Sequence, residues 1–232
     1  MRLNDAMGLS PAAELVQTAV ADTGRTLVRL PGREVSSGLH EVKELGPALR
    51  ASLVRAGIAA KRVALEEPIA MTTWNRPTSK VDLVVYEPTS PVEFVAELKV
   101  WDIGHQLFDA AKACCLLATG VPAAFLICVA QRASDFGWMP GGELFPAAGG
   151  AVREHDFVDL IERHRAEWHR HIGHARPEPT SVPTVVSTIS VSVGIEIDAY
   201  PGHSTRAVEV AVTDPTPVPL TNGWPEGVSP PT

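Results

Sequence analysis

Three charged residues, Asp82, Glu97 and Lys99, lie in two largely apolar segments of the chain. Side chains alternate between the two faces of a strand, so Glu97 and Lys99 are expected to project from the same side. Two neighbouring carboxylates repel each other unless a cation lies between them, and Mg²⁺ prefers oxygen ligands. An adjacent lysine can orient an attacking water, can deprotonate it when the amine is neutral, or can stabilise the charge that develops on phosphate. These residue types therefore predict metal-assisted hydrolysis of a phosphodiester.

The two segments, 81–86 and 92–100, are predicted to pair as a hairpin, because the residues between them are dense in turn formers. With the turn centred on Thr89 and Ser90, antiparallel pairing determines which residues face each other. The expected register is Asp82 opposite Glu97, Val84 opposite Val95, and Tyr86 opposite Glu93. This register brings the two acids together.

The hairpin belongs to a predicted core that runs from residue 47 to residue 130. Its expected order is helix, strand, strand, strand, helix, strand, at residues 47–56, 62–69, 81–86, 92–100, 103–118 and 123–130. The segment 103–118 is apolar on most helical faces, so we expect it to be buried. The short apolar segment 123–130 is typical of an interior strand covered on both sides.

Further elements are expected on either side of this core. A helix is predicted to begin at Ser10-Pro11, an N-cap followed by proline, and to end at Gly24. The remaining predictions are a strand at 26–30, a loop at 134–150, a helix at 156–172, a linker marked by Pro177, Pro179 and Pro183, strands at 185–197 and 205–212, and a proline-rich, poorly ordered end at 214–232. Residues 1–175 are thus interpreted as one α/β domain and residues 176–232 as a β-rich, proline-rich C-terminal extension.

At Asp82 and at Glu97-Leu98-Lys99 the sequence resembles the PD-(D/E)xK nuclease superfamily, which includes restriction endonucleases. The resemblance implies an α/β fold with a restriction-endonuclease-like core, a mixed central sheet flanked by helices, here with an additional N-terminal helix and a β-rich tail. It also implies that Asp82, Glu97 and the carbonyl of Leu98 bind Mg²⁺ or Mn²⁺, with Lys99 near the nucleophilic water. Val81 precedes Asp82, so the proline of the motif name is absent.

The same resemblance suggests further site residues. Many members carry another glutamate on the first core helix, and Glu41 and Glu44 are the nearest candidates. Some exonuclease members place a glutamine on the helix after the motif, where this chain has Gln106. The tyrosine usually found four residues later is replaced by Ala110, which argues against a close relationship to that subgroup.

The resemblance implies a Mg²⁺-dependent deoxyribonuclease whose partner is nucleic acid, in the first place DNA. Two other interpretations stay open: an inactive nuclease-like module that binds nucleic acid or a protein, and an unrelated α/β domain in which Glu97 and Lys99 form an exposed ion pair worth under about 1 kcal/mol. The net charge of −7 weighs against a long DNA-binding face, which is generally basic. Three roles stay open for residues 177–232: pairing with the edge of the sheet, forming a homodimer contact, or remaining a loose segment.

Composition sets the remaining expectations. The 232 residues, 45% hydrophobic and 20% charged, suit one substantial core. No apolar run reaches the roughly 18–20 residues of a membrane span, and three cysteines within apolar stretches favour a cytoplasmic protein without membrane partners.

Asp109 and Lys112 share a predicted helical face with His105, and this face is interpreted equally well as substrate-facing or as solvated. The histidines and arginines between residues 163 and 176 are interpreted as a solvated helix face, with a metal site and phosphate contact as the alternatives.

Overall fold

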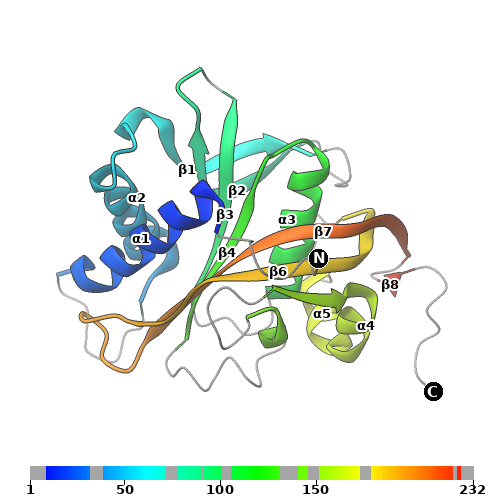
Figure 1. Ribbon diagram of the computed structural model, residues 1–232. Coiled ribbons are helices and arrows are strands. Elements are labelled where there is room, and N and C mark those ends of the chain that lie inside the picture. Colours follow the sequence, from blue (N-terminus) through cyan, green and yellow to red (C-terminus); the bar gives the residue numbers. More distant parts are fainter. Residues whose placement is uncertain are drawn as a thin grey trace, which may run out of the picture.

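One mixed β-sheet organises the protein (Figure 1). The computed structural model describes residues 9–31, 39–71, 78–89, 91–100, 106–130, 141–145, 152–172, 179–221 and 224–225. The strands lie in the order β1-β2-β3-β4-β7-β6-β5, with β8 paired to β7. Their bounds are β1 Val63–Ala70, β2 Thr78–Tyr86, β3 Val92–Val100, β4 Ala124–Ala130, β5 Val152–Asp156, β6 Ser181–Glu196, β7 Ser204–Thr221 and β8 Trp224–Pro225. Strands β3 and β4 are parallel, whereas the other neighbours are antiparallel. The predicted α/β class with a mixed sheet is confirmed.

Helices cover both faces of this sheet, and each face has its own hydrophobic core. Helices α1 (Pro11–Thr26) and α2 (Gly46–Arg55) pack on one face. Helices α3 (Gln106–Ala118), α4 (Phe157–Arg163) and α5 (Arg165–Ile172) pack on the other. Because strand side chains alternate, Phe125 enters the first core and Leu126 enters the second. This explains why every residue of β4 is apolar and buried, as predicted.

Helix α1 begins as its sequence predicts. The side chain of Ser10 accepts a hydrogen bond from the backbone N–H of Ala13, and Pro11 occupies the first turn. The helix continues past Gly24 to Thr26. The strand predicted at 26–30 is wrong: those residues form no strand, and Val28 is 78% exposed.

Gly24 stays inside α1 because of a close approach to β6. A Cβ atom at this position would lie 2.7 Å from the carbonyl oxygen of Glu196 and 2.8 Å from Cγ2 of Ile195. We therefore expect Gly24→Ala to lower the free energy of unfolding by about 1–2 kcal/mol, because the clash outweighs the gain in helix propensity. Urea denaturation measures this, with the exposed Gln17→Ala as a control expected to change stability by less than about 0.5 kcal/mol. A gain in stability on Gly24→Ala would contradict the close packing.

Helix α2 matches its predicted range within one residue at each end. A single π-helical turn, η1 (Glu41–Leu45), precedes it and was not predicted. The proline at position 47 suggests a helix start, but the chain is already helical before this residue, from Glu41 onward. The turn η1 lies against β3 and determines where Glu41 points.

The hairpin of β2 and β3 has the predicted strands and most of the predicted register. Val84 lies opposite Val95, as expected. Tyr86 lies opposite Val92, so its predicted pairing with Glu93 is wrong. An irregularity between Val85 and Tyr86 shifts the register by one residue near the turn.

The late helical segment differs from its prediction. A short strand, β5, ends at Asp156, whose side chain accepts from the N–H of Asp159 at 3.0 Å and so caps α4. The predicted single helix is divided at His164 into α4 and α5. The predicted loop at 134–150 lies mostly outside the described residues, although Gly142–Leu144 within it form a 3₁₀ turn.

The C-terminal segment contributes a long hairpin, β6 and β7, and β7 pairs with β4. The predicted strands are present, but Pro183 lies within β6 instead of a linker, and residues 214–221 belong to β7 instead of a disordered end. The N–H of Leu220 donates to the carbonyl of Thr180 on the β6 side. The backbone N–H groups of successive strand residues point to opposite edges of the strand. Since the N–H of Leu220 points to β6, Pro217 and Pro219 lack their N–H groups on the edge that faces away from β6.

None of the described helices combines the length and the apolar character that a membrane crossing requires.

Candidate functional site

The candidate site lies where β2 and β3 separate. The pairing between these strands ends at Leu83 and Ala96, one pair before Asp82 and Glu97 would meet. Beyond that point, the carboxylate of Asp82 accepts a hydrogen bond from the backbone N–H of Leu98, with Oδ2 and N 2.7 Å apart. The Asp82 side chain therefore takes the place of a strand partner.

Glu41 accepts a hydrogen bond from the backbone N–H of Val100 on β3, as Asp82 does from that of Leu98. Its Oε2 accepts from the N–H of Val100 at 3.3 Å, and its Oε1 lies 3.5 Å from Nζ of Lys99. The turn η1 thus delivers a third carboxylate to the opening between the strands. Of the two glutamates that the resemblance suggested, Glu41 lies at this opening, on the turn that precedes α2.

Two ion pairs connect β3 to α3 in a crossed arrangement. Nζ of Lys112 lies 2.8 Å from Oε2 of Glu97, and Nζ of Lys99 lies 3.5 Å from Oδ2 of Asp109. Residues two apart on a strand share a face, and so do residues three apart on a helix, which allows both pairs to form at once. Asp109 and Lys112 are only 8% and 7% exposed. The interpretation of this helical face as solvated is therefore wrong; His105 lies outside the described residues.

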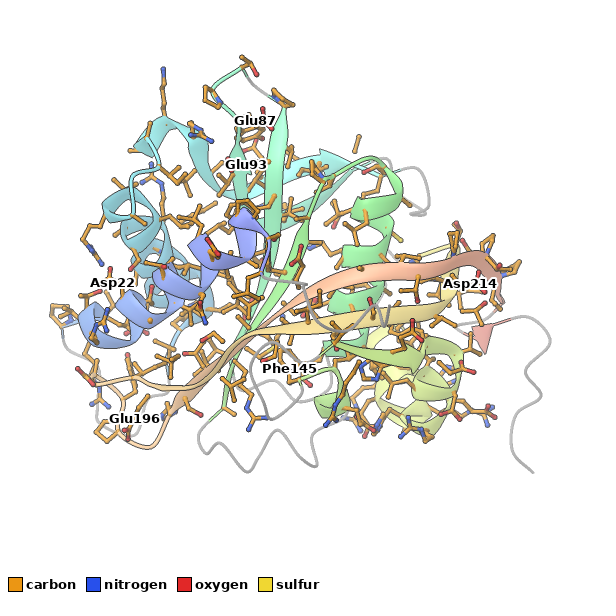
Figure 2. The ribbon with its side chains drawn as sticks, viewed as in Figure 1. Asp22, Glu87, Glu93, Phe145, Glu196 and Asp214 are labelled. Atoms are coloured by element: carbon orange, nitrogen blue, oxygen red, sulfur yellow. The ribbon has the colours of Figure 1, made fainter. Side chains whose placement is uncertain are left out.

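These six side chains form an acid–lysine cluster, defined as Glu41, Asp82, Glu97, Lys99, Asp109 and Lys112. When all are ionised, four carboxylates and two ammonium groups leave an excess of two negative charges. Figure 2 labels acidic side chains of other parts of the fold: Asp22, Glu87, Glu93, Glu196 and Asp214.

Burial and charge act on the pKa values of this cluster. Burial raises the pKa of Glu97 well above its usual range; Lys112 opposes this effect, while Asp82 and Asp109 add to it. Burial likewise raises the pKa of Asp82 and of Glu41. In each case burial, which disfavours the charged form, outweighs the lysines that lower the pKa.

Lys99 is held in its charged form. Burial by itself would lower its pKa, but the carboxylates of Asp109 and Glu41 outweigh burial and raise the pKa of Lys99 above its ordinary value. An ammonium group with a raised pKa donates hydrogen bonds and does not accept a proton. Lys99 is thus suited to charge stabilisation or to orienting a water, and unsuited to acting as a base on its own.

Oε1 of Glu97 is a buried atom of the site with no hydrogen-bond partner within the described residues, and both amide atoms of Gln106, at the start of α3, are in the same state. Gln106 is 1% exposed and opens α3 beside Gly141. Buried polar groups are nearly always satisfied, so such atoms mark places where a water, an ion or a ligand belongs.

A small cavity of about 10 Å³ adjoins the Asp82 side of the cluster. Glu41, Asp82 and Leu98 contribute to its lining. A volume of this size is close to the lower limit for one water-sized occupant.

The donor set suits a hard divalent cation. Among the described residues no three His, Cys, Asp or Glu side chains are already assembled as a metal-binding group. However, the cluster offers oxygen ligands, an excess of negative charge and the unpartnered Oε1 of Glu97. These features fit Mg²⁺ or Mn²⁺, which accept carboxylate and carbonyl oxygens, better than a thiolate-binding or imidazole-binding metal.

Glu44 points away from the cluster. Its carboxylate accepts from the N–H of His40 at 2.7 Å and of Leu30 at 3.3 Å, and the hydroxyl of Tyr200 donates to it as well. The guanidinium of Arg29 lies 4.7 Å from the centre of the Tyr200 ring. Tyr200 comes from the turn between β6 and β7, so Glu44 anchors η1 to the C-terminal hairpin.

We expect Tyr200→Phe to lower the free energy of unfolding by about 1.5–3 kcal/mol, because it removes a buried hydrogen bond to a charged acceptor. Urea denaturation of this variant, of Glu44→Gln and of the double variant forms a double-mutant cycle. Non-additive losses would assign the effect to the Tyr200–Glu44 contact. A loss below about 0.5 kcal/mol, or full additivity, would contradict it.

Of the histidines and arginines from residue 163 onward, Arg163 and His164 form ion pairs at the protein surface, within the part of this group that the structure describes. Arg163 contacts Glu143 and Asp159 at 2.9 Å each, and His164 lies 3.1 Å from Glu143. These contacts agree with the interpretation as a solvated helix face.

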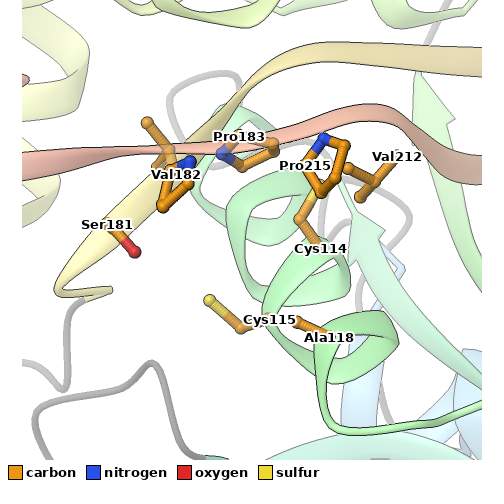
Figure 3. A pocket seen from close by; sticks show the side chains of 9 residues that line it. Cys114, Cys115, Ala118, Ser181, Val182, Pro183, Val212 and Pro215 are labelled. Atoms are coloured by element: carbon orange, nitrogen blue, oxygen red, sulfur yellow. The ribbon is translucent and has the colours of Figure 1, made fainter.

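A second cavity, of about 90 Å³, lies between α3 and the β6–β7 hairpin (Figure 3). Cys114, Cys115, Val182 and Val212 are among its lining residues. Burial raises the pKa of the Cys114 thiol, and that of Cys128 elsewhere in the core. The three cysteines are buried and not in disulfides, as the sequence predicts, and Cys114 and Cys128 are poor nucleophiles.

Comparisons with protein-family models, with curated proteins and with solved structures find no match to this chain.

Proposed function

We propose that this protein is a Mg²⁺-dependent deoxyribonuclease that hydrolyses phosphodiester bonds with water. The observation that carries the proposal is the acid–lysine cluster at the separation of two strands, in which Asp82, Glu97 and Lys99 lie close enough for their charges to act on one another's pKa. Carboxylates crowded in this way are stabilised by a divalent cation, and a phosphodiester is the substrate class that such a cation and an ammonium group serve together.

The arrangement of elements supports the same proposal. From Gly46 to Ala130 the order is α2, β1, β2, β3, α3, β4, with β4 parallel to β3. This is the order that the resemblance to the PD-(D/E)xK superfamily implies. The acids and the lysine stand on β2 and β3, the strands that carry the signature in that superfamily.

The chain's own residues would divide the work as follows. Asp82, Glu97 and the carbonyl of Leu98 would hold the cation, and the N–H of Leu98 fixes the Asp82 carboxylate. A bound Mg²⁺ or Mn²⁺ would lower the pKa of a coordinated water and offset charge on the phosphate. Lys99, kept protonated by Glu41 and Asp109, would donate to a phosphate oxygen or orient the water.

The second candidate is an inactive nuclease-like module that binds nucleic acid or a protein. One observation favours it: Oε2 of Glu97 is already occupied by Lys112. A carboxylate so paired is less available as a ligand.

Cleavage of supercoiled plasmid DNA separates the two candidates. The proposal expects cleavage with Mg²⁺ or Mn²⁺, none with EDTA, and none for Asp82→Asn at full stability. Parallel assays with single-stranded DNA and RNA define the substrate. Retained DNA binding without cleavage in the wild-type protein would favour the inactive module. Absence of both would refute the proposal.

A further inference from the structure

Lys112 has an unusual position for a lysine. It lies in the middle of α3, between Ala111 and Ala113, and its side chain is 9% exposed. Asp109 and Lys112 are the charged residues of this otherwise largely apolar helix. Its Nζ contacts Oε2 of Glu97 at 2.8 Å and also donates to the backbone carbonyl of Lys80 on β2.

Burying this lysine carries a cost that only its partners offset. Removing an ammonium group from water is unfavourable unless an opposite charge and acceptors meet it. Here the charges of Glu97, Asp109 and Asp82 raise the pKa of Lys112 against the effect of burial. Lys112 therefore brings an ammonium group into contact with the carboxylate at the centre of the proposed site.

The two oxygens of Glu97 differ. Oε2 carries the Lys112 contact, whereas Oε1 is buried without a hydrogen-bond partner within the described residues. A cation arriving at Oε1 meets an ammonium group already sharing its ligand. Two positive groups on one carboxylate repel each other strongly at such short range.

We propose that Lys112 is a built-in cation that competes with the divalent metal for Glu97 and so sets the metal affinity of the site. This inference rests on the proposed function. In the absence of metal, Lys112 neutralises Glu97 and holds α3 to β3. When metal binds, the Glu97–Lys112 contact weakens, and the protein requires a higher metal concentration than the same carboxylates alone would need.

The test measures Mn²⁺ and Mg²⁺ binding without any catalytic readout. Isothermal titration at pH 8.5 is combined with thermal unfolding against metal concentration, since a ligand that binds only the folded state raises its stability. The variants are Lys112→Met, which removes the charge; Lys112→Gln, which keeps an N–H donor; and Lys112→Arg, which keeps the charge. Asp82→Asn provides the baseline for binding outside the site.

We expect Lys112→Met and Lys112→Gln to bind Mn²⁺ at least 10-fold more tightly than the wild type, with Lys112→Arg within about 3-fold of it. A neutral variant that folds only with Mn²⁺ present also supports the proposal, because the metal then replaces the ammonium group. A neutral variant that stays unfolded at saturating Mn²⁺ counts against it.

Failure of this inference differs from failure of the proposed function. Equal or weaker Mn²⁺ binding in the neutral variants, with binding above the Asp82→Asn baseline in the wild type, overturns the competition alone. Binding at the baseline in the wild type and in every Lys112 variant overturns both.

Discussion

Replacing Lys99 with methionine is expected to reduce Mg²⁺-dependent DNA cleavage by at least about 100-fold, the typical loss when one preorganised donor to a transition-state charge is removed. Methionine keeps most of the side-chain volume and removes the ammonium group that Glu41 and Asp109 hold in place. Under the proposed function, the loss should appear in kcat more than in DNA affinity. Single-turnover cleavage and a DNA-binding titration measure the two quantities separately.

The matched control for this variant is Lys80→Met. Lys80 lies on β2 with 70% of its side chain exposed, and its ion pair with Glu66 spans 3.6 Å. Lys80→Met removes the same charge from a neighbouring strand. Lys112 donates to the backbone carbonyl of Lys80, which the substitution keeps. Equal activity losses in both variants would indicate a general effect of charge and would contradict the role assigned to Lys99.

Phe125→Ala is expected to lower the free energy of unfolding by about 3–5 kcal/mol. Phe125 is fully buried on β4, and its ring meets that of Phe94 edge-to-face, with centroids 5.4 Å apart. Truncation leaves a cavity between the sheet and the α1–α2 side, and it removes an aromatic contact worth about 0.5–1.5 kcal/mol. Urea denaturation followed by circular dichroism measures the loss.

Phe125→Leu is the control for that prediction. It keeps the site apolar and most of its volume, so we expect a loss of less than about 2 kcal/mol. A change below 1 kcal/mol for Phe125→Ala would show that the core beneath β4 collapses around the deletion.

The sequence predicts the central elements well because their patterns are local. The apolar run of β4, the Ser10-Pro11 helix start and the turn residues between β2 and β3 each act over a few residues. The strand predicted at 26–30 fails because α1 extends through Thr26, and none of the strands in the described part of the chain pairs with the residues that follow. The C-terminal prolines mislead because proline is tolerated at one edge of a strand, and sequence alone does not say which edge is paired.

The candidate site is predicted only in part. Asp82, Glu97 and Lys99 are visible as charges within apolar strands, but the roles of Asp109 and Lys112 depend on how α3 packs on β3. A helical stripe of charge usually faces solvent, which hides these two. The signal in the sequence that could have indicated a buried role for Asp109 and Lys112 is that they are the charged residues of an otherwise largely apolar helix. The position of Glu41 follows from the π-helical turn, which no pattern in the sequence indicated.

The prolines of β7 also bear on how copies of this protein behave at high concentration. At positions 217 and 219 the strand edge directed away from β6 has no amide hydrogens to offer. An extended segment from another molecule would find carbonyl acceptors but no amide donors at these two positions, which works against fibril-like stacking at the end of the longest hairpin in the described fold. Exchanging these prolines for threonine should therefore shorten the lag before aggregation at high protein concentration while the native fold is kept.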